Sequence, residues 1–517
     1  MNSRALPWTN DVETVRQLID WAAEHHKDDA CYKYYREGEI ISKSYIDVKN
    51  NAYAAARYIR SINPNRMHVA LIAKTTYEYL MSFYGVFVSN NVAVPMSSDS
   101  PAEDNAYLVN DADIELVFYD SSYDSRIEDL KKLCPNVKYY IKITPELLGE
   151  IYTKFDDNSE YASLSDVAID PDDCTVIIYT SGTTGARKGA MHSSRSLLSN
   201  IYYYEEEFDT GKTTLNVLPI YHIFCFSSDF LKNMKDRVTV CLNEDIRYLQ
   251  ENMLRFRPHF MRMVPMIIES LLRKTRILRK NNPDMEPRKV AEMVFGDRYE
   301  RIVAGGAPLS GKVAQEFAEM GIKVRSGYGM TETGPRLSVP QPDTCGSSAG
   351  RILSTVKARL RGGELQVKTP SLFMGYYKRP EETEKVFTED GWLMTGDMAR
   401  ITETGELFIT GRLKNIIILS NGENVSPEEI EKKYADEPMV KEMVVYGEGN
   451  SIVAEIYPDY DYAQKNEIND IMGYLEQAVA RVNAESTAAK EIDKIVLRDE
   501  PFTRTSSGKI IRPKKSA

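Results

Sequence analysis

The sequence has few cysteines, and they lie far apart. They occupy positions 31, 134, 174, 225, 241 and 345, without a Cys-x-x-Cys pair or a cluster of His and Cys. Structural zinc sites and disulfide scaffolds both require cysteines at close, regular spacing. The pattern therefore fits a reduced cytoplasmic enzyme better than either of those classes.

The chain also lacks a long hydrophobic run and an excess of basic residues. Its most apolar stretch, residues 79–96, is interrupted by Ser and Asn, and the N-terminus has no apolar core typical of a signal peptide. A formal net charge of −11 argues against a general nucleic-acid-binding protein. A basic amphipathic pattern over residues 267–280 leaves at most peripheral membrane contact open, although a solvated helix face explains it more simply.

Strand-like and helix-like patterns alternate through the first part of the chain. Strand candidates lie at residues 69–73, 92–95 and 116–119, with a helical stretch at 77–88. This order is expected of βαβ units around a mainly parallel sheet. With 517 residues and 42% hydrophobic content, the chain is long enough for substantial cores.

Shorter strands replace this pattern beyond residue 359. Segments 364–368, 398–402 and 407–410 are separated by turns and predict a β-rich subdomain. A boundary is expected near Gly411, before a helix that starts around Ser426. The sequence thus predicts an α/β fold with a large N-terminal portion, residues 1–410, and a small α+β domain, residues 411–517.

The most informative segment runs from Tyr179 to Gly189 and reads Tyr-Thr-Ser-Gly-Thr-Thr-Gly-Ala-Arg-Lys-Gly. Glycines let the backbone approach a ligand, hydroxyl and N–H groups donate, and the lysine supplies positive charge, so the segment suits a triphosphate. A buried strand is predicted at residues 174–179 and a helix after Ser193 or Ser194. We therefore expect the loop to lie between a strand and a helix, where phosphates are often bound.

This loop does not have Walker A spacing, because Gly182 and Gly185 are too close together and Lys188 is followed by Gly189. It resembles the phosphate loop of the acyl-adenylate-forming superfamily, which includes acyl-CoA synthetases and nonribosomal adenylation domains. A plain surface turn is the alternative. The resemblance implies a catalytic role for Lys188 and Mg²⁺ contact by Thr184. It also implies nucleotide contacts for Thr180, Ser181, Gly182, Thr183, Thr184 and Gly185.

Two further motifs match this superfamily in the expected order. The resemblance implies that His222, in Leu-Pro-Ile-Tyr-His, lies beside the acyl site and helps to gate it, although a lone His among aromatics is often a packed core residue. A strand candidate at residues 301–304 leads into a turn, the usual place for a nucleotide in an open α/β sheet. The resemblance implies that this turn lies along adenine, and an ordinary strand-to-helix turn is the alternative. The turn consists of Gly305, Gly306, Ala307 and Pro308.

The fourth motif, Gly327-Tyr-Gly-Met-Thr-Glu332, is highly specific. By resemblance, Tyr328 stacks on adenine beside Gly327 and Gly329, and Thr331 donates to the α-phosphate. Glu332 is then the residue that holds Mg²⁺, directly or through water.

The fifth and sixth motifs suggest ribose contacts and a hinge. A carboxylate can accept two hydrogen bonds from a vicinal diol, and Asp397 in Thr-Gly-Asp matches the ribose ligand of the superfamily. Arg412 matches a second ribose and phosphate contact. Lys414 matches the position where the C-terminal domain swivels, and Gly422 lies in a turn that matches the lining of the pantetheine channel.

The last motif ends the chain, with Lys509 in Ser-Ser-Gly-Lys-Ile-Ile-Arg. By resemblance, this lysine reaches the substrate carboxylate and the α-phosphate during adenylation. A lysine this close to a C-terminus would otherwise be interpreted as part of a solvated tail.

Some positions depart from the superfamily pattern. Many relatives have a His six residues after the loop lysine, where this chain has Ser194, with His192 two positions earlier. The Asp that amino-acid-activating relatives place directly after the second motif is also missing here. Because a buried amine without a carboxylate partner is costly, an amino acid substrate is less expected.

The resemblance implies a two-step ligase. The sequences of its motifs are most similar to those of long-chain fatty acid–CoA ligases. ATP and Mg²⁺ would activate a carboxylic acid, expected to be fatty, as acyl-AMP, and the acyl group would pass to coenzyme A. Three alternatives stay open. They are transfer to the pantetheine of an acyl carrier protein, activation of an amino or aryl acid, and an inactive homologue that binds nucleotide.

Overall fold

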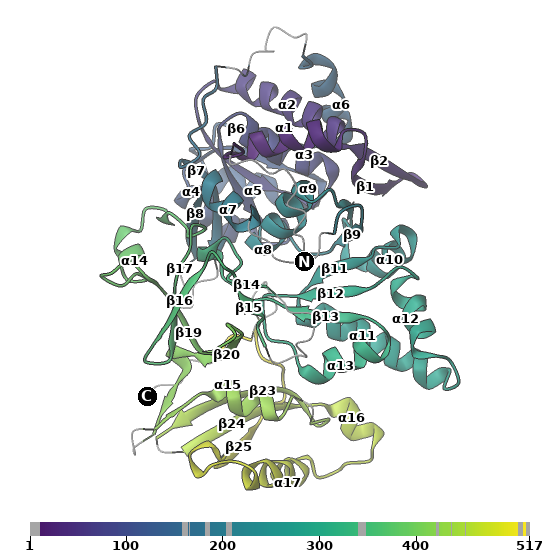
Figure 1. Ribbon diagram of the computed structural model, residues 1–517, viewed down its shortest axis with the longest axis vertical. Coiled ribbons are helices and arrows are strands. Elements are labelled where there is room, and N and C mark those ends of the chain that lie inside the picture. Colours follow the sequence, from purple (N-terminus) through teal and green to yellow (C-terminus); the bar gives the residue numbers. More distant parts are fainter. Residues whose placement is uncertain are drawn as a thin grey trace.

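The protein is described by a computed structural model that covers residues 11–157, 164, 166–180, 187–202, 209–339, 348–419, 423–435, 437–449, 451–504 and 510–512. Figure 1 shows one seven-stranded sheet at the top, a second one on the right below it, and a four-stranded sheet on the left beside the second. A three-stranded sheet with its helices forms the lowest part. The predicted α/β fold, with mainly parallel sheets, a β-rich subdomain and an α+β C-terminal part, is confirmed.

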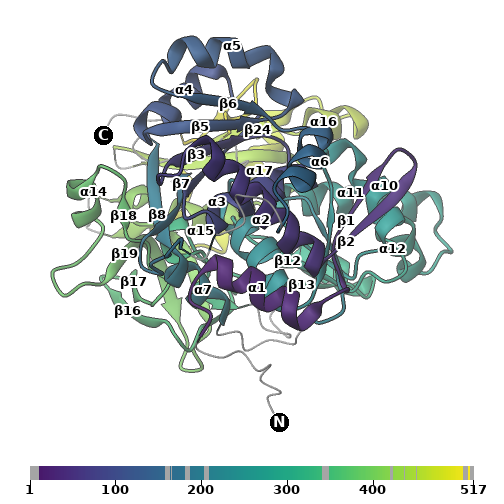
Figure 2. The ribbon, with the colours of Figure 1, turned by 90° about the horizontal axis from the view of Figure 1, so that it is seen from above.

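The first large sheet, here called the N-terminal sheet, has the strand order β18-β8-β7-β4-β3-β5-β6. Its strands are β3 (His68–Ile72), β4 (Val92–Met96), β5 (Ile114–Tyr119), β6 (Tyr139–Lys142), β7 (Cys174–Thr180), β8 (Lys188–Ser193) and β18 (Gly375–Tyr376). Its helices are α1 (Val15–His26), α2 (Tyr45–Ile62), α3 (Tyr77–Val88), α4 (Ala102–Asp111), η1 (Ser121–Tyr123), α5 (Asp124–Leu133), α6 (Pro145–Lys154) and α7 (Ser194–Tyr202). Every residue of α3 is buried, because α1 and α2 lie against it (Figure 2).

The second large sheet, here called the central sheet, has the order β13-β12-β11-β9-β10-β1-β2. Its strands are β1 (Ala30–Arg36), β2 (Glu39–Ser44), β9 (Thr213–Asn216), β10 (Thr239–Leu242), β11 (Phe260–Met263), β12 (Arg301–Ala304) and β13 (Lys323–Ser326). One face packs on a core formed with α10 (Leu249–Phe256), α11 (Pro265–Asn281), α12 (Pro287–Phe295) and α13 (Gly311–Glu319). The short η3 (Ile246–Tyr248) precedes α10, and the segment between β9 and β10 forms α8 (Ile223–Cys225), the π-helix η2 (Phe226–Lys232) and α9 (Asn233–Lys235).

Smaller elements complete the chain. The part before residue 413 adds η4 (Thr331–Thr333), β14 (Ser338–Val339), β15 (Arg351–Ile352), β16 (Lys357–Arg361), β17 (Glu364–Lys368), α14 (Pro380–Glu384), β19 (Leu393–Ile401) and β20 (Leu407–Arg412). The rest forms η5 (Leu413–Asn415), β21 (Ile417–Ile418), β22 (Asn424–Val425), α15 (Pro427–Lys433), β23 (Val440–Glu448), β24 (Ser451–Pro458), α16 (Tyr460–Lys465), α17 (Ile471–Ala484), η6 (Ala488–Lys490) and β25 (Lys494–Leu497). This last part has a hydrophobic cluster of its own.

The glycine-rich loop does not connect a strand to a helix, and that expectation was wrong. Strand β7 pairs with β8 in antiparallel fashion, with Thr180 opposite Lys188, so the loop joins two neighbouring strands. Helix α7 begins only after β8. Gly189 permits this pairing, because a Cβ there would lie 2.6 Å from a methyl group of Ile177. The short segment Gly-Ala-Met-His has little strand propensity, and only its pairing with β7 makes it a strand.

Helix α11 explains the basic amphipathic pattern over residues 267–280. Its apolar residues Ile268, Leu271 and Leu272 are buried against the central sheet. Two of its arginines, Arg276 and Arg279, pair with acidic residues of α13. The pattern therefore matches a helix packed on the fold. Within the described ranges, no helix combines the length and the apolar character that a membrane span requires.

The contact between α2 and α3 depends on Gly85. A Cβ at this position would lie 2.8 Å from the Cβ of Ala55 and 3.1 Å from backbone atoms of α2. We predict that Gly85→Ala lowers the free energy of unfolding by about 1–3 kcal/mol, because buried helices must separate. Urea unfolding would measure this change.

Gly149 provides the matched control, because it lies in α6 and a Cβ added there would meet nothing within 4 Å. Gly149→Ala should raise the free energy of unfolding by about 0.5–1 kcal/mol through helix propensity. Equal effects of the two substitutions would contradict the close-approach argument.

Candidate active site

Two of the predicted nucleotide-binding turns lie side by side at the carboxyl edge of the central sheet. Gly305 follows β12 and Gly327 follows β13, and the N–H of Gly327 donates to the carbonyl of Ala304 at 3.2 Å. Gly306 has a φ of +82°, which favours glycine. Ala307 and Pro308 are exposed at the same turn. This is the edge at which open α/β sheets bind ligands.

Glycine is also required at position 329 of the neighbouring motif. A Cβ there would lie 1.8 Å from the carbonyl oxygen of Pro335, so the backbone of this motif approaches the following segment closely. The approach brings the chain into η4, which carries Thr331 and Glu332.

Glu332 is buried and has a defined partner. The hydroxyl of Tyr376, in β18, donates to Oε1 of Glu332 at 2.6 Å. Burial first, and then the charge of Glu332, raise the pKa of Tyr376 well above its usual range. Tyr376 therefore remains a hydrogen-bond donor.

Lys188 lies on the other side of the same tyrosine. Its Nζ is 5.1 Å from the centre of the Tyr376 ring and 2.6 Å from Oε2 of Glu382, in α14. Hydrogen bonds from Lys188 and Lys385 lower the pKa of Glu382 to about 2. The lysine predicted to bind phosphate and the carboxylate predicted to hold Mg²⁺ are thus joined through one aromatic side chain.

His192 positions Thr331. Its Nε2 donates to the carbonyl oxygen of Thr331 at 2.8 Å, across from β8 to η4. Burial lowers the pKa of His192 to about 4, so its imidazole is neutral near pH 7. The sequence left the role of this histidine open, and the geometry gives it a structural one.

Asp397 is held by two of the other predicted site residues. The Nε of Arg412 lies 2.7 Å from its Oδ1, and the hydroxyl of Tyr328 donates to its Oδ2. Asp397 and Arg412 face each other in the pairing of β19 with β20. Both carboxylate oxygens therefore have protein partners, and a ribose diol would have to share or replace the Tyr328 hydroxyl.

His222 lies at the same edge as these groups. It is the N-cap residue of α8, and its ring lies 4.6 Å from that of Tyr221. Two residues further on, the ring of Phe224 would lie 2.7 Å from a Cβ at Gly305. The start of α8 therefore covers the turn after β12.

Several predicted site residues lie outside the described residues. These are Ser181, Gly182, Thr183, Thr184, Gly185, Gly422 and Lys509. The chain on either side of Lys509 is described: Arg504 pairs with Glu442 and Arg512 with Glu431, each at 2.7 Å. Burial raises the pKa of Glu269, in α11, while Arg273 and Arg504 oppose the shift. The charge of Arg504, on the flank of the Lys509 segment, therefore acts on a residue of α11.

The described part of the chain holds no cluster of three or more His, Cys, Asp or Glu residues arranged to bind a metal ion. Glu332 is a single buried carboxylate. Mg²⁺ commonly uses one or two carboxylates together with substrate phosphates and water. The donor set therefore fits Mg²⁺ that arrives with a nucleotide.

Sequence reasoning missed Tyr376 and Glu382 entirely. Neither belongs to a glycine-rich motif, and Glu382 lies 194 residues from Lys188 along the chain. Only the pairing of β18 with β8 brings them to the loop.

Comparison with known proteins places this site in a family. Residues 19–377 match the AMP-binding enzyme family, and residues 414–517 match the AMP-binding enzyme C-terminal domain. The chain therefore belongs to the AMP-binding enzyme family, whose members include adenylate-forming acyl-CoA ligases.

Similar proteins include long-chain fatty acid–CoA ligases. The Long-chain-fatty-acid–CoA ligase FadD15 of Mycobacterium bovis is 25% identical over 484 residues, which cover 84% of this chain and 80% of that protein. Long-chain-fatty-acid–CoA ligase 5 of Rattus norvegicus is 27% identical over 541 residues, covering 89% and 77%.

Solved structures share the fold. ATP-bound MatB from Rhodopseudomonas palustris has a TM-score of 0.78 and 24% identity, covering 96% of this chain and 97% of that one. A fatty acyl CoA synthetase from Mycobacterium tuberculosis has a TM-score of 0.71 and 22% identity, covering 97% of both chains.

The contact between Lys188 and Glu382 leads to a test. If nucleotide phosphates replace Glu382 as partners of Lys188, Glu382→Gln should lower the apparent KM for ATP by about two- to fivefold, the range expected for one exposed ion pair. Glu384→Gln removes a carboxylate from the same helix without changing that contact, and it should leave KM unchanged. A higher KM in Glu382→Gln would mean that Glu382 supports nucleotide binding instead.

Proposed function

We propose that this protein activates a carboxylic acid with ATP, as an acyl-AMP, and transfers the acyl group to coenzyme A. The observation that carries the proposal is the arrangement of Lys188 and Glu332 on one tyrosine, Tyr376. A cation and a carboxylate so close together suit a magnesium–phosphate group. Membership of the AMP-binding enzyme family supports the same interpretation.

In the first step the substrate carboxylate attacks the α-phosphate of ATP, and pyrophosphate leaves. Lys188 and Lys509 would neutralise charge on the transferred group, and Thr331 would donate to it. Asp397 and Arg412 would hold the ribose, and the turns at Gly305 and Gly327 would hold adenine. Mg²⁺ held by Glu332, with Thr184, would supply further neutralisation of phosphate charge.

In the second step the coenzyme A thiol attacks the acyl-AMP, which releases AMP and the thioester. We propose that residues 411–517 form a mobile domain that turns about Lys414 between the steps. Lys414 is exposed and lies in η5, two residues after the last strand of the four-stranded sheet, a suitable place for a hinge. The turn would remove Lys509 from the site and bring the segment around Gly422 over it.

The acceptor and the acid are tested together. AMP and pyrophosphate release would be measured with a panel of fatty, aryl and amino acids, each with and without coenzyme A. Turnover that requires one class of acid and coenzyme A is expected. Pyrophosphate exchange without stimulation by coenzyme A would instead favour a carrier protein as acceptor. If no acid in the panel gives AMP or pyrophosphate release, the result would contradict the proposal and favour a nucleotide-binding homologue without activity.

Lys509→Ala should slow the first step and leave the second step unchanged. Loss of its positive charge should slow acyl-AMP formation by about a hundredfold or more, since such groups stabilise the transition state. Thioester formation from supplied acyl-AMP should remain near that of the unmodified protein. A parallel loss in both half-reactions would count against an adenylation role.

Lys414→Pro should leave the first step unchanged and slow the second step. Proline fixes φ and so restricts a swivel at this position. Pyrophosphate release should be retained while thioester formation slows. Lys414→Ala controls for the lost charge, and if it has the same effect as proline, the charge matters and not the hinge.

A further inference from the structure

The π-helix η2 and the turn of α9 that follows it carry buried charged and polar groups next to the candidate site. Asp229 and Lys232, in η2, and Asn233, in α9, each have 0% exposure. Charged residues are almost never buried so completely without partners. π-helices are rare and frequently occur at functional sites.

The central sheet presents a matching row of residues to this helix. Arg262 in β11 is in register with Val303 in β12, which is in register with Arg325 in β13. Side chains two residues apart on a strand share a face. Gly305 and Gly327, two residues beyond Val303 and Arg325, begin the candidate nucleotide turns. The row containing Arg262 therefore forms the layer directly behind the site.

Arg262 and Asp229 join the helix to this row. Nη1 of Arg262 lies 2.9 Å from Oδ1 of Asp229 and donates to Asn233 at 3.2 Å. Asn216, at the end of β9, donates to the other oxygen of Asp229 at 3.1 Å. All four side chains are buried. We call these four residues, Asn216, Asp229, Asn233 and Arg262, the polar wall.

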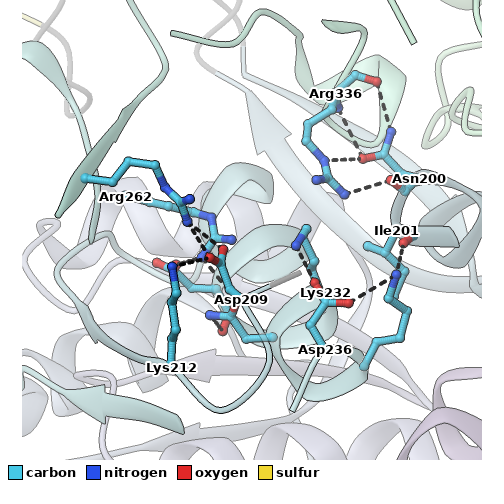
Figure 3. Close-up of polar contacts among 12 residues, drawn as sticks. Asn200, Ile201, Asp209, Lys212, Lys232, Asp236, Arg262 and Arg336 are labelled. Carbon is cyan, nitrogen blue, oxygen red and sulfur yellow. Dashed lines mark hydrogen bonds and ion pairs between the residues drawn. The ribbon is translucent and has the colours of Figure 1, made fainter. Parts of the chain in front are cut away.

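Further ion pairs continue the charged layer beyond the polar wall (Figure 3). Lys232 pairs with Asp236, and Lys235 donates to the carbonyl of Ile201 at 2.7 Å. Burial lowers the pKa of Lys232, and the positive charge of Arg262 adds to this shift. The layer between helix and sheet is therefore polar over several residues.

Phe224, in α8, lies next to the turn after β12 and precedes the η2 residues of the polar wall in the chain. Its ring contacts the space above Gly305, as a Cβ at that position would meet it at 2.7 Å. An acyl chain that extended from this turn between α8 and the sheet would meet the ring first and the polar wall next. Methylene groups offer no hydrogen bonds to replace those of Asp229 and Arg262, so insertion would leave buried charges without partners.

We propose that the polar wall ends the acyl site and restricts the substrate to carboxylic acids with a compact acyl group, not a long alkyl chain. This inference rests on the proposed function. It concerns the acid alone and leaves the two-step reaction unchanged.

The unmodified protein provides the first test. Acetate, butyrate, hexanoate, decanoate and palmitate would be compared by AMP release with coenzyme A present. We expect kcat/KM to fall by about a hundredfold or more between the best short acid and palmitate, because a single methylene group in a pocket already changes kcat/KM by roughly 10–200-fold. If palmitate is the best substrate, the proposed role of the polar wall is wrong, while the proposed ligase function still stands. No turnover with any acid would contradict the proposed function itself.

A double variant tests the polar wall directly. Asp229→Leu with Arg262→Met removes both charges at similar volume and avoids a single buried charge without its partner. The ratio of kcat/KM for decanoate over hexanoate should rise by about tenfold or more. An unchanged ratio in a folded double variant would overturn the assignment.

The matched control uses a second buried pair on the same face of the sheet. Arg301 pairs with Asp209 at 2.6 Å and lies two residues before Val303, further from the carboxyl edge. Asp209→Leu with Arg301→Met should leave the decanoate-to-hexanoate ratio unchanged. If this ratio rises equally in the control variant, the effect comes from general destabilisation of the fold. That result would contradict the proposed role of the polar wall. If neither double variant folds, the acid series with the unmodified protein still decides.

Discussion

The hydrogen bond from Tyr376 to Glu332 is the contact on which the candidate site depends. It joins β18, at the edge of the N-terminal sheet, to η4, which follows the last strand of the central sheet. The two sheets meet at the site through this bond and through the bond from His192 to Thr331. Because Glu332 is buried, removal of the tyrosine hydroxyl would leave a carboxylate without compensation, which costs more than the bond itself contributes. The position of Lys188 over the same ring depends on it as well.

The charged groups of the site already have partners inside the protein. Glu382 forms an ion pair with Lys188. Arg412 and Tyr328 both bind the carboxylate of Asp397. A nucleotide would therefore exchange one set of charge-assisted hydrogen bonds for another, and only the difference would contribute to affinity. Such an arrangement keeps flexible side chains in place before a ligand arrives, which reduces the ordering that binding requires.

Local patterns predicted much of the fold. Helix α3 and strands β12 and β17 have the bounds expected from sequence, because periodicity and β-branched residues are properties of short segments. Strand β8 was missed, since only its pairing with β7 makes it a strand. Tyr376 was missed for the same reason, because β18 reaches the site through its pairing with β8. The glycine-rich motifs marked turns that other parts of the chain approach closely, such as those at Gly305 and Gly329. The side chains that contact Lys188 and Glu332 came from elsewhere in the chain.

In the proposed reaction, different layers of the molecule would recognise the acid and the nucleotide. The motifs that carry the resemblance to long-chain ligases are those expected to contact phosphate, ribose and adenine, so similarity in those motifs carries little information about the acyl group. The residues proposed to end the acyl site, such as Asp229 and Arg262, lie within segments of mixed polarity that no motif covers. Their significance follows from strand register, which pairs Arg262 with Val303, two residues before Gly305, and from their burial. Since a buried ion pair is often no more stabilising than apolar residues of the same size, the pair of Asp229 and Arg262 calls for a functional explanation, and the proposed selection against long chains provides one.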